Sequence, residues 1–179
     1  MVGTISGTST DAFNDLRIDK YTNDALVEVD GDISVTGDLT IIKGDLKILS
    51  GHTVSGEILE IESNGKLTNV GTLDVTADFN IDGNLTNDGI AMGDHIVVQS
   101  NGTLINNSTF NVQEINIDGT LTNNGVLDIE GSIWNNNLVQ GSGTYYCGLN
   151  WATFNGVFDG SAAKMIICLL YTSPSPRDS

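Results

Sequence analysis

The chain repeats itself at a short and nearly constant period, and this repetition restricts its fold more than any other feature. The stretch SNGKLTNVGTLDV begins at Ser63, and the similar stretch SNGTLINNSTFNV begins at Ser100. The shared pattern contains glycines at positions 65, 83, 102 and 119, which are 18, 19 and 17 residues apart. This period is too short for a propeller blade or a helix pair, and it fits one coil of a β-solenoid.

Aligning the repeats on these glycines places the same residue types in the same columns. Two positions after each glycine stands a leucine, and four positions after it stands an asparagine. The columns are Leu67, Leu85, Leu104 and Leu121, and Asn69, Asn87, Asn106 and Asn123. Because stacked coils place equivalent residues on one another, we expect a continuous leucine core and a ladder of asparagine amides. The alternative is that the asparagines are ordinary turn residues.

Pairs of apolar residues two positions apart complete the repeat and predict short strands with one buried face. These pairs are Leu73 and Val75, Phe79 and Ile81, Ile96 and Val98, Phe110 and Val112, Ile115 and Ile117, and Leu127 and Ile129. One copy departs from the pattern, with Ala91 and Gly93 in place of a large apolar pair. We expect Gly and Asn at fixed offsets to supply corners with positive φ.

The remaining chain also favours strands. GDISV, GDLTI and GDLKI, from Gly31, Gly37 and Gly44, each combine a turn with a short alternating strand. The segment DAFNDLRIDKY, from Asp11, fits a strand at least as well as a helix. After Gly131 the pattern loosens and includes both Trp residues, and continuing coils are favoured over an insertion.

The sequence therefore predicts an all-β fold, a single-stranded, right-handed parallel β-solenoid (β-helix) with coils of about 18 residues. The solenoid is expected to span residues 1–167, with regular coils over about 31–131 and looser ones over 132–167. Residues 168–179, CLLYTSPSPRDS, resemble the conceptual translation of a sequencing adapter. We expect this tail to be non-native, to follow a reading frame cut near Ile167 in a fragment of metagenomic origin, and not to pack as a cap.

Charge limits the partners of the chain. It contains 7 Lys and Arg against 23 Asp and Glu, a net charge of −16, and no Lys or Arg from Leu67 to Ala163. Such a surface repels phosphate backbones, which argues against nucleic acid, and gains nothing from an anionic membrane. No apolar run reaches the length of a membrane span, and MVGTISGTSTDAF does not resemble a signal peptide.

Clusters of acidic residues are the first candidates for a site. Asp82 and Asp118 occupy equivalent corners of different coils, which we interpret as repetition rather than as a catalytic pair. Asp30, Asp32 and Asp38 lie around a DGD corner. They predict either a weak Ca²⁺ site or, more simply, solvated turn carboxylates.

Other chemically distinctive residues carry weaker signals. His52 and His95 have no ligand spacing, and Cys147 is expected to be a buried or partly buried thiol. Thr68, Thr86 and Thr122 form a column interrupted by Ile105, too little for an ice-binding array. Glycosylation sequons begin at Asn84, Asn101, Asn106 and Asn107, as composition alone would produce. We assign no catalytic, cofactor-binding or metal-binding residue.

The repeats resemble those of long bacterial surface proteins exported by a type IX route, which are similar in architecture to filamentous adhesins. The resemblance rests on GTISGTSTDAFNDLRIDK, on GDISVTGDLTIIKGDLKI and on GTLTNNGVLDIEGSIWNNN. It implies a secreted or cell-surface location, a non-catalytic structural or adhesive function, and a cell-surface glycan or protein as partner. The alternative is a fragment of a carbohydrate-active β-helix enzyme, a polysaccharide lyase or glycoside hydrolase.

Overall fold

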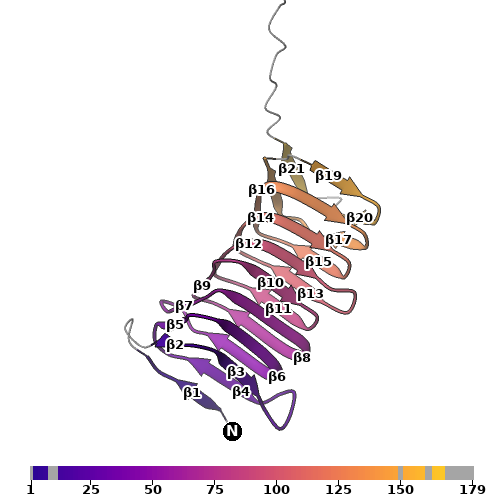
Figure 1. Cartoon of the computed structure of the whole chain (residues 1–179). Coiled ribbons are helices and arrows are strands. Elements are labelled where there is room, and N and C mark those ends of the chain that lie inside the picture. Colours follow the sequence, from indigo (N-terminus) through magenta and orange to yellow (C-terminus); the bar gives the residue numbers. More distant parts are fainter. Residues whose placement is uncertain (1, 8–11, 149–150, 160–162, 168–179) are drawn as a thin grey trace, which may run out of the picture.

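The chain forms a parallel β-solenoid of about eight turns with a spacing of about 19 residues (Figure 1). The structure is a computed structural model that describes residues 2–7, 12–148, 151–159 and 163–167. The described residues contain 21 strands, and every strand pairing is parallel. They contain no helix, and so none that could cross a membrane. The tail predicted not to pack, residues 168–179, lies outside the described residues.

Each coil has three strand segments, and equivalent segments stack into three faces, A, B and C. Face A comprises β3 (Leu16–Asp19), the first parts of β6 (Asp38–Ile48) and β8 (Ile58–Asn69), β10 (Asp78–Ile81), the last parts of β12 (Ile90–Val98), β14 (Thr109–Ile117) and β16 (Val126–Asn135), and β19 (Trp151–Phe154). Because β6, β8, β12, β14 and β16 run through corners, each contributes to two faces.

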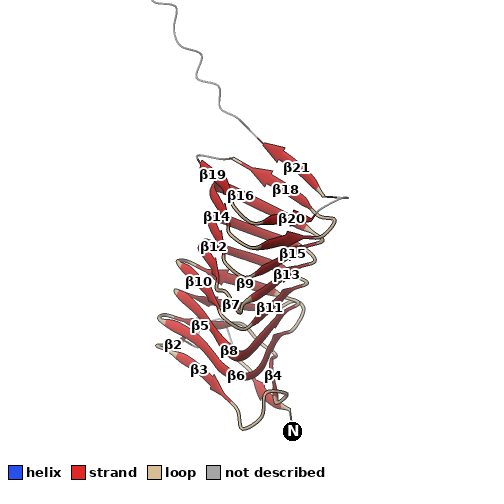
Figure 2. Ribbon diagram, turned by 90° about the vertical axis from the view of Figure 1, so that its right-hand side faces the viewer, coloured by secondary structure: helices blue, strands red, loops and turns tan. Residues whose placement is uncertain are grey.

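The other two faces are built in the same way. Face B comprises β1 (Gly3–Ile5), β4 (Leu26–Val29), the last parts of β6 and β8, β11 (Asn84–Asn87), β13 (Thr103–Asn106), β15 (Thr120–Asn123), β17 (Leu138–Gln140) and β20 (Val157–Asp159). Face C comprises β2 (Ala12–Phe13), β5 (Ile33–Val35), β7 (Thr53–Gly56), β9 (Thr72–Val75), the first parts of β12, β14 and β16, β18 (Thr144–Cys147) and β21 (Lys164–Ile167). Figure 2 shows the coils stacked along one axis from β3 to β21.

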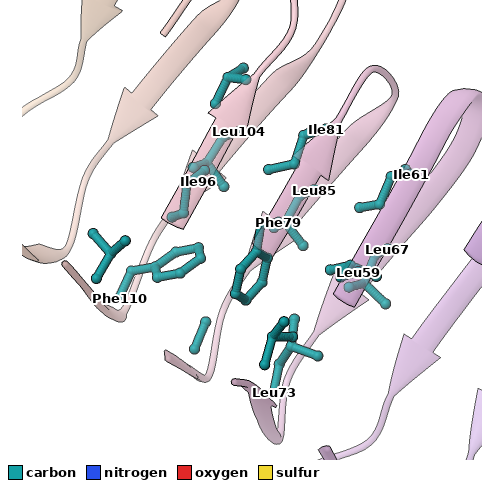
Figure 3. Packing of buried hydrophobic residues seen from close by; sticks show 14 of the residues in the cluster. Leu59, Ile61, Leu67, Leu73, Phe79, Ile81, Leu85, Ile96, Leu104 and Phe110 are labelled. Atoms are coloured by element: carbon teal, nitrogen blue, oxygen red, sulfur yellow. The ribbon is translucent and has the colours of Figure 1, made fainter. Parts of the chain in front are cut away.

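The predicted leucine column is confirmed. Leu67, Leu85, Leu104 and Leu121 are register partners in successive coils, and all are buried. Alternate residues of each strand point inward, so no single coil has a core of its own, but the stack has a continuous one (Figure 3). The same stacking continues past Gly131, where Val139 lies on Leu121 and Tyr145 lies on Leu127.

The predicted amide ladder is also confirmed, and it closes the corner between faces B and C. The Nδ2 atoms of Asn69, Asn87 and Asn106 each donate to the Oδ1 atom of the next asparagine, at 2.8, 2.9 and 2.8 Å. Each Nδ2 also donates to a carbonyl of the next coil, at Ile90, Thr109 and Val126. Because the asparagines are fully buried, this double bonding removes the cost of desolvating their amides.

The ladder has two defined ends. Before it, the register position is occupied by Ile48, which cannot donate, and the Oδ1 atom of Asn69 has no partner among the described residues. After it, Asn123 donates to the Thr144 carbonyl at 3.2 Å. The buried Tyr145 hydroxyl lies beside this end without a well-formed hydrogen bond. Burial is the main reason that the pKa of Tyr145 rises to about 12, and the nearby Asn123 opposes the rise.

The expectation that corner glycines supply positive φ is wrong for the repeat. Among the described residues only Gly44, Gly51 and Gly141 have positive φ, and no other residue type does. The glycine column instead makes room between coils. A Cβ atom at Gly65 or Gly102 would collide with the carbonyl oxygen of Ile41 or Ile81 in the preceding coil. Close backbone approach, rather than a left-handed conformation, explains these glycines.

The irregular copy with Ala91 and Gly93 is a packing solution rather than a defect. A Cβ atom at Gly93 would collide with the Phe79 ring of the neighbouring coil. Phe79 and Phe110 pack edge to face, with ring centroids 5.3 Å apart and an interplanar angle of 62°. Both rings are fully buried, so two large side chains fill the space that Ala91 and Gly93 leave (Figure 3).

Changing Gly93 to valine is therefore expected to lower the free energy of unfolding by about 2 kcal/mol, because the side chain overpacks against Phe79. Val112, its register partner, shows that valine suits this column elsewhere. The double variant Gly93→Val/Phe79→Leu should lose about 1 kcal/mol less free energy of unfolding than the sum of the losses in the two single variants. Urea denaturation of the wild type, both single variants and the double variant measures this coupling. Strict additivity would contradict the packing account.

Candidate functional site

A hollow on face A gathers carboxylates from neighbouring coils. It has a volume of about 300 Å³ and is lined by Glu60 and Glu62 of one coil and Asp82 of the next, with Asn80 and Gln99 beside them. Glu60 and Asn80 are outward-pointing register partners on face A, and Glu62 and Asp82 follow them at the corner. Placed carboxylates of this kind are what hydrolysis of a glycosidic bond requires.

The sequence predicts that Asp82 and Asp118 are repeated corner residues rather than a catalytic pair. In the structure each of them accepts a hydrogen bond from a different asparagine. Asn101 donates to Asp82 Oδ1 at 3.2 Å, and Asn136 donates to Asp118 Oδ1 at 2.8 Å. Asn155 then donates to Asn136 at 3.1 Å, so Asp118 begins a ladder at the corner between faces A and B. The two aspartates are acceptors for amides of following coils, in line with their interpretation as repeated corner residues.

A second exposed ladder, which was not predicted from the sequence, runs along the corner between faces B and C. Asn107 donates to Asp88 Oδ1 at 2.8 Å, and Asn124 donates to Asn107 Oδ1 at 2.9 Å. Each of these residues directly follows a member of the buried Asn column. This adjacency to the asparagine column is the sequence feature from which the exposed ladder could have been predicted. Both exposed ladders begin with an aspartate, which makes the first bond charge-assisted.

A larger hollow lies outside Gly93. It has a volume of about 440 Å³ and extends over four successive coils, with Met92 and Asn111 in its lining and Asp74, Asp94 and Glu130 contributing carboxylates. Gln113 donates to Glu130 at 2.7 Å across it. Within the described ranges, no three His, Cys, Asp or Glu side chains are grouped so that they could hold a metal ion.

The DGD corner does not assemble its three aspartates. Asp30 contacts His52 Nε2 at 3.2 Å, and Asp32 accepts a hydrogen bond from the Thr53 backbone N–H at 2.8 Å. The third residue, Asp38, belongs to β6, where its backbone N–H donates to another carboxylate. The weak Ca²⁺ site considered from the sequence therefore gains no support from the geometry.

The other distinctive residues occupy ordinary positions. His95 Nδ1 contacts Asp78 Oδ1 at 3.4 Å, so each histidine lies beside one aspartate. Cys147 is buried in the core. The Thr68 column is in register with Thr86, Ile105, Thr122 and Gln140, and Thr122 accepts a hydrogen bond from Gln140 at 3.0 Å. The Asn106 sequon is inaccessible because that residue is a buried rung of the ladder.

Asp45 is the one described carboxylate with a clearly perturbed pKa. It opens the last part of β6 and is a register partner of Lys66. Burial raises its pKa above the ordinary value of 3.8, and the charges of Lys66 and Lys47 only partly oppose the rise. Its Oδ1 atom has no hydrogen-bond partner in the part of the chain that the structure describes, and the Lys66 amine contacts Asp24 at 3.6 Å.

Asp45→Asn is consequently expected to increase the free energy of unfolding near neutral pH. A carboxyl whose pKa is raised by folding contributes stability below its unfolded pKa, and this contribution is lost as the pH rises through the folded pKa. The advantage of the variant should appear as the pH rises above 3.8 and shrink at lower pH. Urea denaturation across this range measures it. An equal difference at all pH values would contradict the role of ionisation.

No protein family model, no curated protein and no solved structure matches the chain.

Proposed function

We propose that the chain is a non-catalytic structural or adhesive segment of a large secreted cell-surface protein. The observation that carries this proposal is the uninterrupted stack, in which core columns and the amide ladder tie each coil to the next. Stacked strands are about 4.8 Å apart, so eight coils build a rod of about 38 Å. Such a rod holds its ends at a fixed distance and presents repeated side chains along its length.

Face B is the part of the rod that we propose contacts a partner. Its outward side chains over β11, β13, β15 and β17 are Asn84, Thr86, Thr103, Ile105, Thr120, Thr122, Leu138 and Gln140. None of them is charged, although the whole chain has a net charge of −16. An uncharged surface suits a neutral cell-surface glycan or an uncharged protein surface better than a polyanion.

A carbohydrate-active enzyme is the second candidate, and one specific observation favours it. Glu60, Glu62 and Asp82 line the same hollow, and they come from neighbouring coils. A glycoside hydrolase needs two such carboxylates on either side of the scissile bond. The surrounding amides of Asn80 and Gln99 could hydrogen-bond sugar hydroxyls.

The two candidates are separated by testing binding and turnover on the same polysaccharides. The immobilised chain is incubated with neutral and acidic polysaccharides, and both retention and released reducing ends are measured. We expect retention of a neutral polysaccharide without turnover, weakened by Thr103→Glu/Thr122→Glu and unchanged by the control Glu60→Gln/Asp82→Asn. Turnover that the Glu60→Gln/Asp82→Asn variant abolishes would overturn the proposal in favour of the enzyme.

A further inference from the structure

Four Asn-Gly steps lie at corners of the solenoid, and they differ in how the asparagine is held. They are Asn64-Gly65, Asn101-Gly102, Asn124-Gly125 and Asn155-Gly156. An Asn-Gly step is the sequence most prone to spontaneous deamidation, because glycine places no side chain in the way of the attacking backbone nitrogen. The reaction requires the side-chain amide to turn toward that nitrogen, so hydrogen bonds on either group suppress it.

Three of the four asparagines are held by the preceding coil. The Nδ2 atoms of Asn101, Asn124 and Asn155 donate to Asp82, Asn107 and Asn136 at 3.2, 2.9 and 3.1 Å. The following glycines are held as well, because the N–H groups of residues 102, 125 and 156 donate to backbone carbonyls at 2.7, 3.1 and 2.9 Å. Both reacting groups are thus engaged while the coils stay stacked.

Asn64 is held differently. Its side chain is exposed, and its Oδ1 atom accepts a hydrogen bond from Asn23 Nδ2 at 3.2 Å. Within the part of the chain that the structure describes, its own Nδ2 donates to no other group. Among the four asparagines, Asn64 is therefore the one whose side-chain amide nitrogen, the group that leaves as ammonia, donates no hydrogen bond to another described residue.

We propose that Asn64 is the site at which the folded chain deamidates, and that side-chain hydrogen bonds to the preceding coil protect the other three steps. The Gly65 backbone nitrogen loses its proton and attacks Cγ of Asn64. The new C–N bond replaces the C–Nδ2 bond, and the Nδ2 group takes up a proton and leaves as ammonia. Water then opens the resulting succinimide at either carbonyl, giving aspartate or isoaspartate at position 64. No electron donor or acceptor is involved, and water is the only co-reactant.

The product changes the local surface in a defined way. An aspartate at position 64 keeps the acceptor for Asn23 and adds a negative charge two residues before Lys66. An isoaspartate lengthens the main chain by one carbon inside β8, where Asn64 is the register partner of Lys43. That extra atom shifts the register of the following residues, which belong to the buried leucine and asparagine columns.

The test is to incubate the full chain at mildly alkaline pH and to quantify deamidation at each Asn-Gly step by peptide mapping with mass spectrometry. In the folded protein Asn64 should deamidate about tenfold faster or more than Asn101, Asn124 and Asn155, because the hydrogen bond donated by Nδ2 must open at each of those three steps. In concentrated urea the four rates should converge, since the local sequences all contain Asn-Gly.

Two variants test the cause. Asn107→Ala removes the acceptor of Asn124 and should accelerate deamidation at Asn124 alone. Asn64→Gln should abolish the early product without affecting the other sites. Equal rates at the four steps in the folded protein would overturn the proposal. An order that persists unchanged in urea would also overturn it, because local sequence would then explain the selectivity.

Discussion

Replacing Asn106 with leucine is expected to lower the free energy of unfolding by about 4 kcal/mol, the largest effect of any single change considered for this chain. The substitution keeps the approximate volume and removes one of the two interior rungs of the buried ladder. It leaves an Nδ2 hydrogen of Asn87, the Oδ1 atom of Asn123 and the Val126 carbonyl without their present partners. Urea denaturation followed by far-ultraviolet circular dichroism measures the change.

The neighbouring residue provides the matched control. Asn107 has the same side chain one position later, but it is exposed and bonds Asp88 at the surface. Asn107→Ala is expected to cost less than about 1 kcal/mol, because water replaces the lost partner. Equal costs at positions 106 and 107 would contradict the claim that the buried ladder stabilises the stack.

Gly102→Ala is expected to cost about 3 kcal/mol or more, the second large effect. The added Cβ atom would collide with the Ile81 carbonyl oxygen of the preceding coil, and neither backbone segment can move without separating two coils. Gly51→Ala is the control. Gly51 has a φ of 85°, but apart from its two chain neighbours no described residue has an atom within 4 Å of the position of a Cβ atom.

The two glycine variants distinguish close approach from backbone conformation. If close approach is the reason for the glycine column, Gly51→Ala should cost only about 1 kcal/mol, from its strained φ, and far less than Gly102→Ala. Thermal and urea denaturation of both variants test this order. A loss at Gly51 equal to or larger than the loss at Gly102 would contradict the close-approach account of the glycine column.

The repeat made the core columns predictable from the sequence. Leu67 and Leu85, or Asn69 and Asn87, stand at the same offset from a glycine, and a solenoid converts equal offset into direct contact. The same logic extends to the exposed ladders, since Asp88, Asn107 and Asn124 each follow a buried asparagine. This column was not recognised in the sequence because it mixes Asp88 with Asn107 and Asn124. Aspartate and asparagine are different residue types, although the side-chain oxygen of each can accept the same hydrogen bond.

Features that depend on how coils compensate for one another could not be predicted in this way. Position 93 has a glycine instead of an apolar side chain because the Phe79 ring of another coil occupies the space that such a side chain would fill. The perturbed Asp45 likewise depends on burial against adjacent coils and on Lys66 contacting Asp24 instead. The hollow at Glu60 and Asp82 also requires the corner geometry, which the spacing alone does not contain.

The most direct test of the central claim, a rod of in-register stacked coils, is a set of distances along one column of face B. Lys47, Thr68, Thr86, Ile105, Thr122 and Gln140 are successive register partners and point outward. Spin labels are placed at position 47 and at 86, 122 or 140, in a background with Cys147→Ala and Cys168→Ser. Electron paramagnetic resonance then measures each separation.

Stacked strands about 4.8 Å apart predict narrow distributions centred near 10, 19 and 24 Å, for two, four and five coil steps. A linear increase with the number of coils is the result that the account predicts. Distances that do not increase with coil number, or broad distributions at all three pairs, would contradict the stacked solenoid and the proposed function that rests on it.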